Sequence, residues 1–369
     1  MQGIRIEDHA TLAATRDHDT GTDASPMKTL DHARPGGWHR QAGAAPAAGP
    51  GEAFRDLTPD AVVDAVESLG LRADGRVLAL NSYENRVLRV GLEDAGAVVA
   101  KFYRPARWSD AQIREEHAFV AESHEEGLSV VPPLAFDGET LHALHGLRFA
   151  LFPVQGGHAP EMDRAEVRLA LGETLGRLHA VGARTPFRHR EAIDIDRLGW
   201  TSLDTLLEGP WIEPALRRSF EDVGSALLEA VEDAFDATGP TTGRRLHGDL
   251  HPGNVLWRDG RPHLVDFDDA RSGPAVQDLW MLLDADPRRR ERQLEELLAG
   301  YERFCDFDQG ELALIEALRA LRIVHFHAWV ARRWEDPAFP AAFPQFADRT
   351  HWERVLGEWR EQLALLRGA

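Results

Sequence analysis

Apolar residues follow two different patterns along the chain, and the change falls near residue 154. Before that point, short apolar runs bounded by turn residues indicate strands, at 75–80, 86–90, 97–103, 130–134 and 148–154. After it, apolar residues spaced three or four apart indicate helices, at 166–181, 211–237, 274–283, 289–304, 311–334 and 351–366. The chain therefore predicts an α+β fold, with a small sheet-bearing lobe followed by a large helical lobe.

Two more helices are predicted in the first half, and both have good capping residues. Thr58 is a suitable N-cap with Pro59 at the first helical position, and Gly70 ends that helix. Ser109 caps a second helix that extends to about residue 126. Residues 1–52 show no apolar periodicity and include a run of Ala, Pro and Gly, so we expect a disordered N-terminal extension there.

The stretch from 246 to 269 holds the strongest chemical signal. Asp249 and Asn254 lie five residues apart across a turn that contains a Pro-Gly pair. A predicted hairpin follows and delivers Asp266 at the end of its second strand. The hairpin folds Asp266 back beside the loop, so two carboxylates and a carboxamide converge on one spot. The alternative is a polar loop capped by its own Asp and Asn side chains.

Oxygen ligands of this kind suit Mg²⁺, which is usually held by one or two carboxylates together with substrate phosphates. Phosphoryl transfer needs such a metal and an aspartate that orients and deprotonates the attacking hydroxyl. In kinases the catalytic Asp precedes a metal-binding Asn by five residues, and a later Asp also binds metal. The spacing of Asp249, Asn254 and Asp266 therefore predicts a phosphotransferase that uses ATP and Mg²⁺.

Lysine is almost absent from this sequence, which makes its position informative. Of 42 basic residues only Lys28 and Lys101 are lysines, and Lys101 ends a strand that is expected to be buried. A compact ammonium suits a site between phosphate oxygens and a carboxylate better than a wide guanidinium does. Kinases pair this lysine with a helical glutamate, and of Glu115 and Glu116 we favour Glu116, which lies nearer the apolar face. A lysine retained by chance and an exposed glutamate are the alternatives.

Three further positions have predicted roles. Ser82 lies in the loop between the first two strands, where its hydroxyl and nearby amides would bond phosphate oxygens. This loop lacks the Gly-x-Gly-x-x-Gly pattern, so a plain β-turn is the alternative. Asp278 is expected in a buried helix, where it would accept amides from the catalytic loop. His179 is interpreted as a buried residue at a helix end rather than a ligand.

Composition narrows the classes of function. The formal net charge of −19 argues against nucleic acid as the main partner. No apolar run reaches the roughly 18 residues of a membrane helix, no secretory signal pattern is present, and the single Cys305 excludes an internal disulfide. We therefore expect a cytoplasmic protein without a nucleic-acid or membrane partner. The basic run from Arg288 to Arg292 is interpreted as a solvated helix face.

Several motifs together resemble the aminoglycoside phosphotransferase and choline kinase superfamily over residues 54–365. They lie at 81–87, 101–105, 247–256, 266–271, 273–283 and 332–340. Within that superfamily the chain resembles bacterial Ser/Thr protein kinases of the stress response. The resemblance implies a protein-kinase-like fold with ATP between two lobes. Residues 53–153 would form the lobe that binds the ATP phosphates, and 154–369 the helical lobe with the catalytic loop and metal site.

The resemblance also implies roles for individual residues. Asp249 would accept the proton, Asn254 and Asp266 would bind Mg²⁺ for catalysis, and Ser82 would lie at the ATP phosphates. It further implies a monomeric cytoplasmic enzyme that phosphorylates Ser or Thr of proteins, including itself, and protects cells under stress.

The residues themselves leave the acceptor open. Asp278 follows only twelve positions after Asp266, so there is no room for the long activation loop with which ordinary kinases dock peptides. The alternative acceptor is a small-molecule alcohol (an amino alcohol, homoserine or an aminoglycoside), and acidic residues at 268, 269, 306 and 308 would attract a cationic one. A third hypothesis is a nucleotide-binding scaffold without turnover, which the intact set of catalytic residues disfavours.

Overall fold

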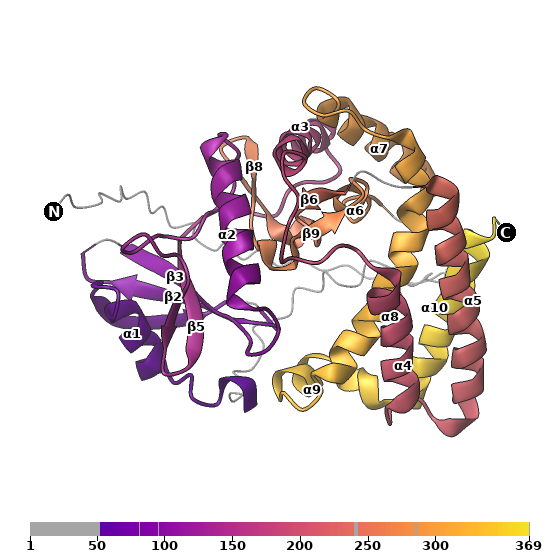
Figure 1. Ribbon diagram of the computed structural model, residues 1–369, viewed down its shortest axis with the longest axis horizontal. Helices are drawn as coiled ribbons and strands as arrows, with labels where there is room; N and C mark the ends of the chain where they lie inside the picture. The colour runs from indigo at the N-terminus through magenta and orange to yellow at the C-terminus, as the bar shows by residue number, and fades with distance from the viewer. Residues whose placement is uncertain (1–51, 81, 95, 240–242, 285, 369) are drawn as a thin grey trace, which may run out of the picture.

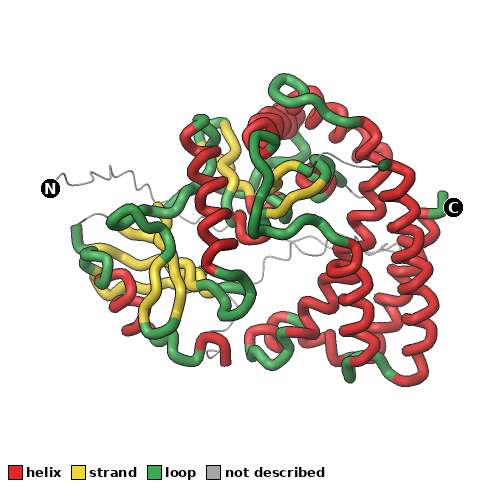
Figure 2. The backbone as a smooth tube through the Cα atoms, viewed as in Figure 1, coloured by secondary structure: helices red, strands yellow, loops and turns green. Residues whose placement is uncertain are grey.

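The chain folds into two lobes in a computed structural model that describes residues 52–80, 82–94, 96–239, 243–284 and 286–368 (Figure 1). The smaller lobe contains a β-sheet, and the larger lobe is mainly helical (Figure 2). The fold class is therefore α+β, which confirms the prediction from the change in apolar pattern. Of the expected extension, residues 1–51 lie outside the described residues.

The sheet of the small lobe is antiparallel, with strand order β1-β2-β3-β5-β4. Its strands are β1 (Ala73–Ala79), β2 (Arg86–Leu92), β3 (Gly96–Phe102), β4 (His142–Leu144) and β5 (Leu147–Pro153). Helix α1 (Pro59–Glu67) packs its apolar side against these strands. Helix α2 (Asp110–Glu125) lies between the sheet and the large lobe (Figure 1).

Both helices of the small lobe begin where their capping residues predict. The Thr58 hydroxyl accepts a hydrogen bond from the Ala61 amide at 3.2 Å, and Pro59 occupies the first helical position. Ser109 and Gln112 form a reciprocal capping box at the start of α2. These local signals fix the entry of each helix independently of the rest of the fold.

One predicted strand is absent from the sheet, and one strand of the sheet was not predicted. Residues 130–134 form no strand, and only Val130 makes an isolated bridge, with Leu264. The adjacent Pro132 and Pro133 carry no backbone N–H, so this segment cannot donate a continuous ladder of hydrogen bonds. Strand β4 was missed because it has only three residues, which is too short for an apolar pattern.

The large lobe is built from helices, with two short two-stranded sheets among them. Its helices are α3 (Ala165–Gly182), α4 (Thr201–Glu208), α5 (Pro214–Thr238), α6 (Gln277–Trp280), α7 (Pro287–Tyr301), α8 (Ile315–Arg332), α9 (Ala338–Ala342) and α10 (Arg349–Leu366). Its sheets pair β6 (Arg244–Leu246) with β9 (Arg271–Gly273), and β7 (Val255–Arg258) with β8 (Arg261–Leu264). The helix expected at 274–283 is reduced to the four residues of α6. None of the helices in the described part of the chain combines the length and apolar composition that crossing a membrane requires.

Glycines allow α3 and α7 to approach until their backbones touch. A Cβ atom added to Gly172 would lie 1.9 Å from the Leu297 carbonyl oxygen, and one added to Gly176 would lie 2.3 Å from that of Tyr301. The contact matters to the site because α3 also carries His179, which contacts Asp278. The packing of α3 against α7 therefore fixes the position of His179, and through it the position of Asp278.

We expect Gly172→Ala to lower the free energy of unfolding by about 1–3 kcal/mol, because the added methyl group overpacks a backbone contact. The matched control is Gly357→Ala on α10, where a Cβ meets nothing within 4 Å. That substitution should raise the free energy of unfolding by about 0.5–1 kcal/mol, as alanine does in an open helix position. Urea unfolding of both variants measures the difference, and equal effects would contradict the close packing of α3 and α7.

Candidate active site

The catalytic loop turns sharply at Gly248 and returns at Asn254. Gly248 has φ +85°, and a Cβ there would lie 2.1 Å from the Asp269 carbonyl oxygen. Only glycine satisfies both the left-handed backbone and this close approach. Farther along, the side-chain Nδ2 of Asn254 donates to the Asp249 carbonyl oxygen at 2.9 Å, which closes the loop and leaves Asn254 Oδ1 as an available oxygen ligand.

The hairpin that follows brings Asp266 back to this loop, as the sequence predicts. Val255 pairs with Leu264, and beyond that pair the Val265 amide donates to the Asn254 carbonyl oxygen at 3.1 Å. His247 Nε2 donates to the Val265 carbonyl oxygen at 2.9 Å. Asp266 itself has a left-handed backbone, with φ 61°. The backbone N–H and C=O of Val265, the residue before Asp266, are therefore both bonded to the catalytic loop.

Asp278 holds the catalytic loop from beneath. Its fully buried carboxylate accepts the amides of His247 at 2.7 Å and Gly248 at 2.8 Å, and the Nε2–H of His179 at 3.0 Å. Burial raises the pKa of Asp278, but the hydrogen bonds from His179 and Gly248 lower it by more, so the pKa lies below its usual value. The amide contacts predicted for Asp278 are therefore confirmed.

His179 is a buried structural residue, as expected. Burial lowers its pKa more than the bond to Asp278 raises it, so the ring is neutral. Its other nitrogen, Nδ1, accepts a hydrogen bond from the Tyr301 hydroxyl at 2.9 Å. The chain of contacts from Tyr301 through His179 to Asp278 links α7 and α3 to the catalytic loop.

Lys101 faces this site from the small lobe. Its Nζ lies 3.1 Å from Asp266 Oδ1 and 3.0 Å from Asp268 Oδ1, and only 8% of its side chain is exposed. Burial lowers the pKa of Lys101, but the nearby carboxylates, led by Asp266, hold it well above its usual value. The lysine is therefore charged, buried and directed toward the end of the hairpin.

The expected ion pair between Lys101 and Glu116 is replaced by a different arrangement. Glu116 is buried, which supports its choice over Glu115, but its carboxylate pairs with Arg190 at 2.8 Å. Arg190 also donates to the Asp268 carbonyl oxygen at 2.6 Å. Its wide guanidinium reaches both groups at once, so Glu116 is joined to the segment after Asp266 through Arg190 rather than directly to the lysine.

Two other arginines complete the site, and no local pattern in the sequence predicted either of them. Arg107 bonds both Asp268 and Asp269. Although burial raises the pKa of Asp268, Arg107 and Lys101 lower it to about 2. Both carboxylates are thus neutralised by cations of the chain, so the attraction for a cationic acceptor expected from residues 268 and 269 finds no support. Arg322 on α8 bonds the carboxylate of Asp249.

The oxygen donors that converge here fit a magnesium ion. Asn254 Oδ1 and the Asp266 carboxylate, which is 52% exposed, supply the small number of protein ligands that Mg²⁺ takes when waters and phosphates complete its shell. Within the described residues, no group of three or more His, Cys, Asp and Glu side chains is arranged to hold a metal. Ser82 lies, partly exposed, in the loop between β1 and β2.

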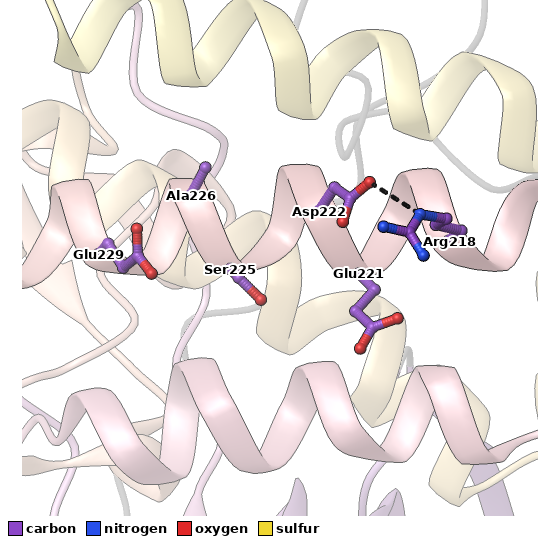
Figure 3. Close-up of a pocket in the computed structure, with 6 residues that line it drawn as sticks. All are labelled: Arg218, Glu221, Asp222, Ser225, Ala226 and Glu229. Carbon is purple, nitrogen blue, oxygen red and sulfur yellow. Dashed lines mark ion pairs between the residues drawn. The ribbon is translucent and has the colours of Figure 1, made fainter.

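A separate hollow of about 350 Å³ runs along α5, away from these residues (Figure 3). Its lining comes from one helix and consists of Arg218, Glu221, Asp222, Ser225, Ala226 and Glu229. Arg218 and Asp222 pair with each other across one helical turn. Among the described residues no second element contributes to this lining, so the hollow is an open surface of α5.

We expect Asp278→Asn to lower the free energy of unfolding by about 3 kcal/mol, because it removes the charged acceptor from buried donors. The pKa of Asp278 is lowered in the fold, so its contribution is present above the unfolded-state value near pH 4 and is lost as pH falls further. Urea unfolding between pH 3 and pH 8 should therefore show a constant gap from wild type above about pH 5 that narrows below about pH 4. The control is Asp204→Asn, an exposed position on α4, and a gap that widens in acid would contradict the assignment.

Comparison with known proteins places the chain in a family. The model described as a phosphotransferase enzyme family, APH, matches residues 76–315. Stress response kinase A of Salmonella choleraesuis (strain SC-B67) is 43% identical over 313 residues, which are 85% of this chain and 94% of that relative. Stress response kinase A of Escherichia coli (strain K12) is 42% identical over the same shares of each chain. The serine/threonine protein kinase RdoA of Salmonella typhimurium is 43% identical, again over 85% and 94%.

Solved structures of kinases share the fold. Amicoumacin kinase hAmiN, in complex with AMP-PNP, Ca²⁺ and Ami, superposes with a TM-score of 0.61 at 17% identity, covering 81% of this chain and 94% of that one. Spectinomycin phosphotransferase APH(9)-Ia, with ADP and spectinomycin, gives 0.60 at 12% identity, covering 84% and 98%. At these identities the likeness concerns architecture alone. The family match and the close relatives together show that this chain belongs to the phosphotransferase enzyme family, alongside the stress response kinases A, and is a kinase.

Proposed function

We propose that this kinase transfers the γ-phosphate of ATP, with Mg²⁺, to Ser or Thr hydroxyls of proteins. The observation that carries the proposal is the joining of loop and hairpin that sets Asp249, Asn254 and Asp266 together, opposite the buried ammonium of Lys101. This constellation matches what phosphoryl transfer requires, namely a base, oxygen ligands for a metal and a cation for the phosphates.

Each residue has a distinct task in this proposal. Asn254 and Asp266 would hold Mg²⁺, which neutralises charge on the phosphate oxygens when it is bound. Lys101 holds its charge at the end of the hairpin, where it would bind α- and β-phosphate oxygens, and Ser82 would bond phosphate from the opposite loop. Asp249 would orient the acceptor hydroxyl and take its proton, while Arg322 holds one carboxylate oxygen in place.

A protein acceptor is favoured over a small cationic alcohol by two observations. The relative named as a serine/threonine protein kinase is 43% identical over most of both chains, whereas the antibiotic kinases are only 12–17% identical. In addition, Asp268 and Asp269 are already paired with Arg107, so they leave no anionic surface for a cationic substrate at that point. The proposal extends to autophosphorylation, a monomeric state, a cytoplasmic location and a role in the stress response.

Incubation of the purified chain with radiolabelled ATP, Mg²⁺ and alternative acceptors tests the proposal. We expect label in the chain itself and in generic protein substrates, on Ser and Thr, and none in amino alcohols, homoserine or aminoglycosides. Omission of Mg²⁺ should abolish transfer. Label confined to a small alcohol would overturn the protein acceptor, and tight ATP binding without transfer to any acceptor would favour a non-catalytic scaffold.

We expect Asp249→Ala to reduce phosphate transfer by roughly 10²–10⁴-fold, the usual contribution of a general base. Nucleotide affinity should stay within about two-fold of wild type, because Asp249 faces the acceptor rather than the phosphates. Initial rates and calorimetric titration with ATP measure the two quantities, and Asp204→Asn again serves as the control. Wild-type turnover by the alanine variant would show that another group takes the proton.

A further inference from the structure

The loop that carries Ser82 is bonded to the end of α8 in the large lobe. Glu84, in this loop, accepts a hydrogen bond from Trp329 Nε1 at 2.5 Å. It also accepts one from Arg333 Nη2 at 2.8 Å and forms an ion pair with Arg333 Nε at 2.7 Å. Trp329 and Arg333 lie one turn apart at the end of a helix that runs toward the small lobe (Figure 1).

A second contact between the lobes is centred on Asp336, just past α8. Its carboxylate accepts hydrogen bonds from Arg104 at 2.7 Å and from Arg86 at 3.2 Å. Arg86 begins β2 directly after the loop, and Arg104 follows β3. Asp336 therefore binds the first residue of β2 and a residue just past β3, the strand that pairs with β2. It lies in the 332–340 motif, which has no role in the candidate active site described above.

Arg104 joins these two contacts to the backbone of the loop. Its guanidinium donates to the carbonyl oxygens of Tyr83 at 3.2 Å and Glu84 at 2.8 Å. Its own amide donates to the Asn85 side chain at 3.1 Å. The same guanidinium pairs with the Glu84 and Asp336 carboxylates, so the Arg104 side chain links Asp336 to Tyr83 and Glu84, and its backbone amide adds Asn85.

These charges are largely removed from water, which makes their pairing consequential. The side chains of Asp336 and Glu84 are only 5% and 11% exposed. Removing one partner from a buried ion pair leaves the other charges without compensation, so the segments that carry them must move. Burial raises the pKa of Asp336, but Arg104 and its other partners hold it below the usual value, so the carboxylate is ionised at neutral pH.

We propose that Asp336 and Glu84 are positioning residues, through which the large lobe fixes the phosphate-binding loop for ATP. Ordinary protein kinases cover the phosphates with a glycine-rich loop. Here the loop lacks that pattern and is anchored by a network of Glu84, Arg86, Arg104, Arg333 and Asp336. ATP affinity then depends on a carboxylate about 70 positions beyond the catalytic hairpin. The inference rests on the proposed ATP-dependent function, but it makes a claim about the loop that holds without nucleotide.

The test uses the full chain with Asp336→Asn, Glu84→Gln and the double variant. The matched control is Glu335→Gln, an exposed neighbour of Asp336. Thermal unfolding verifies that each variant is folded. If Asp336→Asn does not fold, Glu84→Gln still tests the inference. Hydrogen exchange of residues 82–88, without nucleotide, reports the anchoring of the loop. Calorimetric titration with ATP, KM for ATP and kcat report its consequence.

We expect the dissociation constant and KM for ATP to rise roughly ten- to one-hundred-fold in each single variant. Values of kcat at saturating ATP and of KM for the acceptor should stay within about two-fold, a split that a general loss of structure would not produce. Exchange should accelerate at 82–88 and not at 247–255. The double variant should lose less ATP affinity than the two single losses combined would predict, because both carboxylates pair with Arg104.

Unchanged exchange and unchanged ATP affinity in both single variants would overturn the inference while leaving the proposed function intact. Tighter ATP binding by Asp336→Asn would overturn it too, since the released arginines would then be binding the nucleotide themselves. If the wild-type chain fails to bind ATP, the proposed function is overturned, and so is the inferred effect on ATP affinity. Hydrogen exchange without nucleotide would then still show whether Asp336 and Glu84 anchor the loop, which tests that part of the inference separately from the proposed function.

Discussion

One buried carboxylate determines the shape of the catalytic loop. Asp278 is fully buried and accepts two consecutive backbone amides together with the His179 ring. A buried charge is tolerated only when its hydrogen bonds are made, so the loop, α3 and α6 must meet at this point for the fold to form. Because Tyr301 on α7 bonds the same histidine, the geometry of the loop follows from the packing of the helices beneath it.

The rest of the site consists of cationic side chains bonded to the carboxylates and backbone of the segment that begins at Asp266. Lys101 is held by Asp266 and Asp268, and Arg107 and Arg190 fasten the segment that follows. Each of the three cations has the geometry its contacts require. The compact ammonium lies between two carboxylates at nearly equal distances, while the guanidiniums reach two or more oxygens each. A chain so rich in arginine keeps its one structurally described lysine at the position where a forked cation would be too wide.

The sequence predicted the elements whose signals are local. Thr58, Ser109 and the helical periodicities located most helices within a few residues, and the turn after Asp249 with its hairpin located the loop. The role of Asp278 was also predictable, since an aspartate in an apolar helix must find donors. The π-helical turn Asp196–Trp200, α4, α9 and β4 were not predicted, because short elements are stabilised by tertiary contacts rather than by their own pattern.

The ion-pair partners of the charged site residues could not be predicted from the sequence, for a different reason. Arg190 lies 74 positions from Glu116, and Arg322 lies 73 from Asp249. Pairing over such distances is set by the fold, and among 40 arginines no local feature distinguishes those that become buried. The spacing of Asp249, Asn254 and Asp266 can be read from one stretch of sequence. The arginines that bond the site residues are brought to them only by the fold.

The contact between Gly248 and the Asp269 carbonyl oxygen also limits how such an enzyme can be switched on. Protein kinases carry arginine at the corresponding place in His-Arg-Asp, and arginine clusters in kinases order their activation loops by pairing with an added phosphate. Here the backbone of the segment after Asp266 occupies the space that any side chain at 248 would need. An arginine at 248 would therefore require withdrawal of that segment, so the His-Arg-Asp form of the loop is incompatible with this packing.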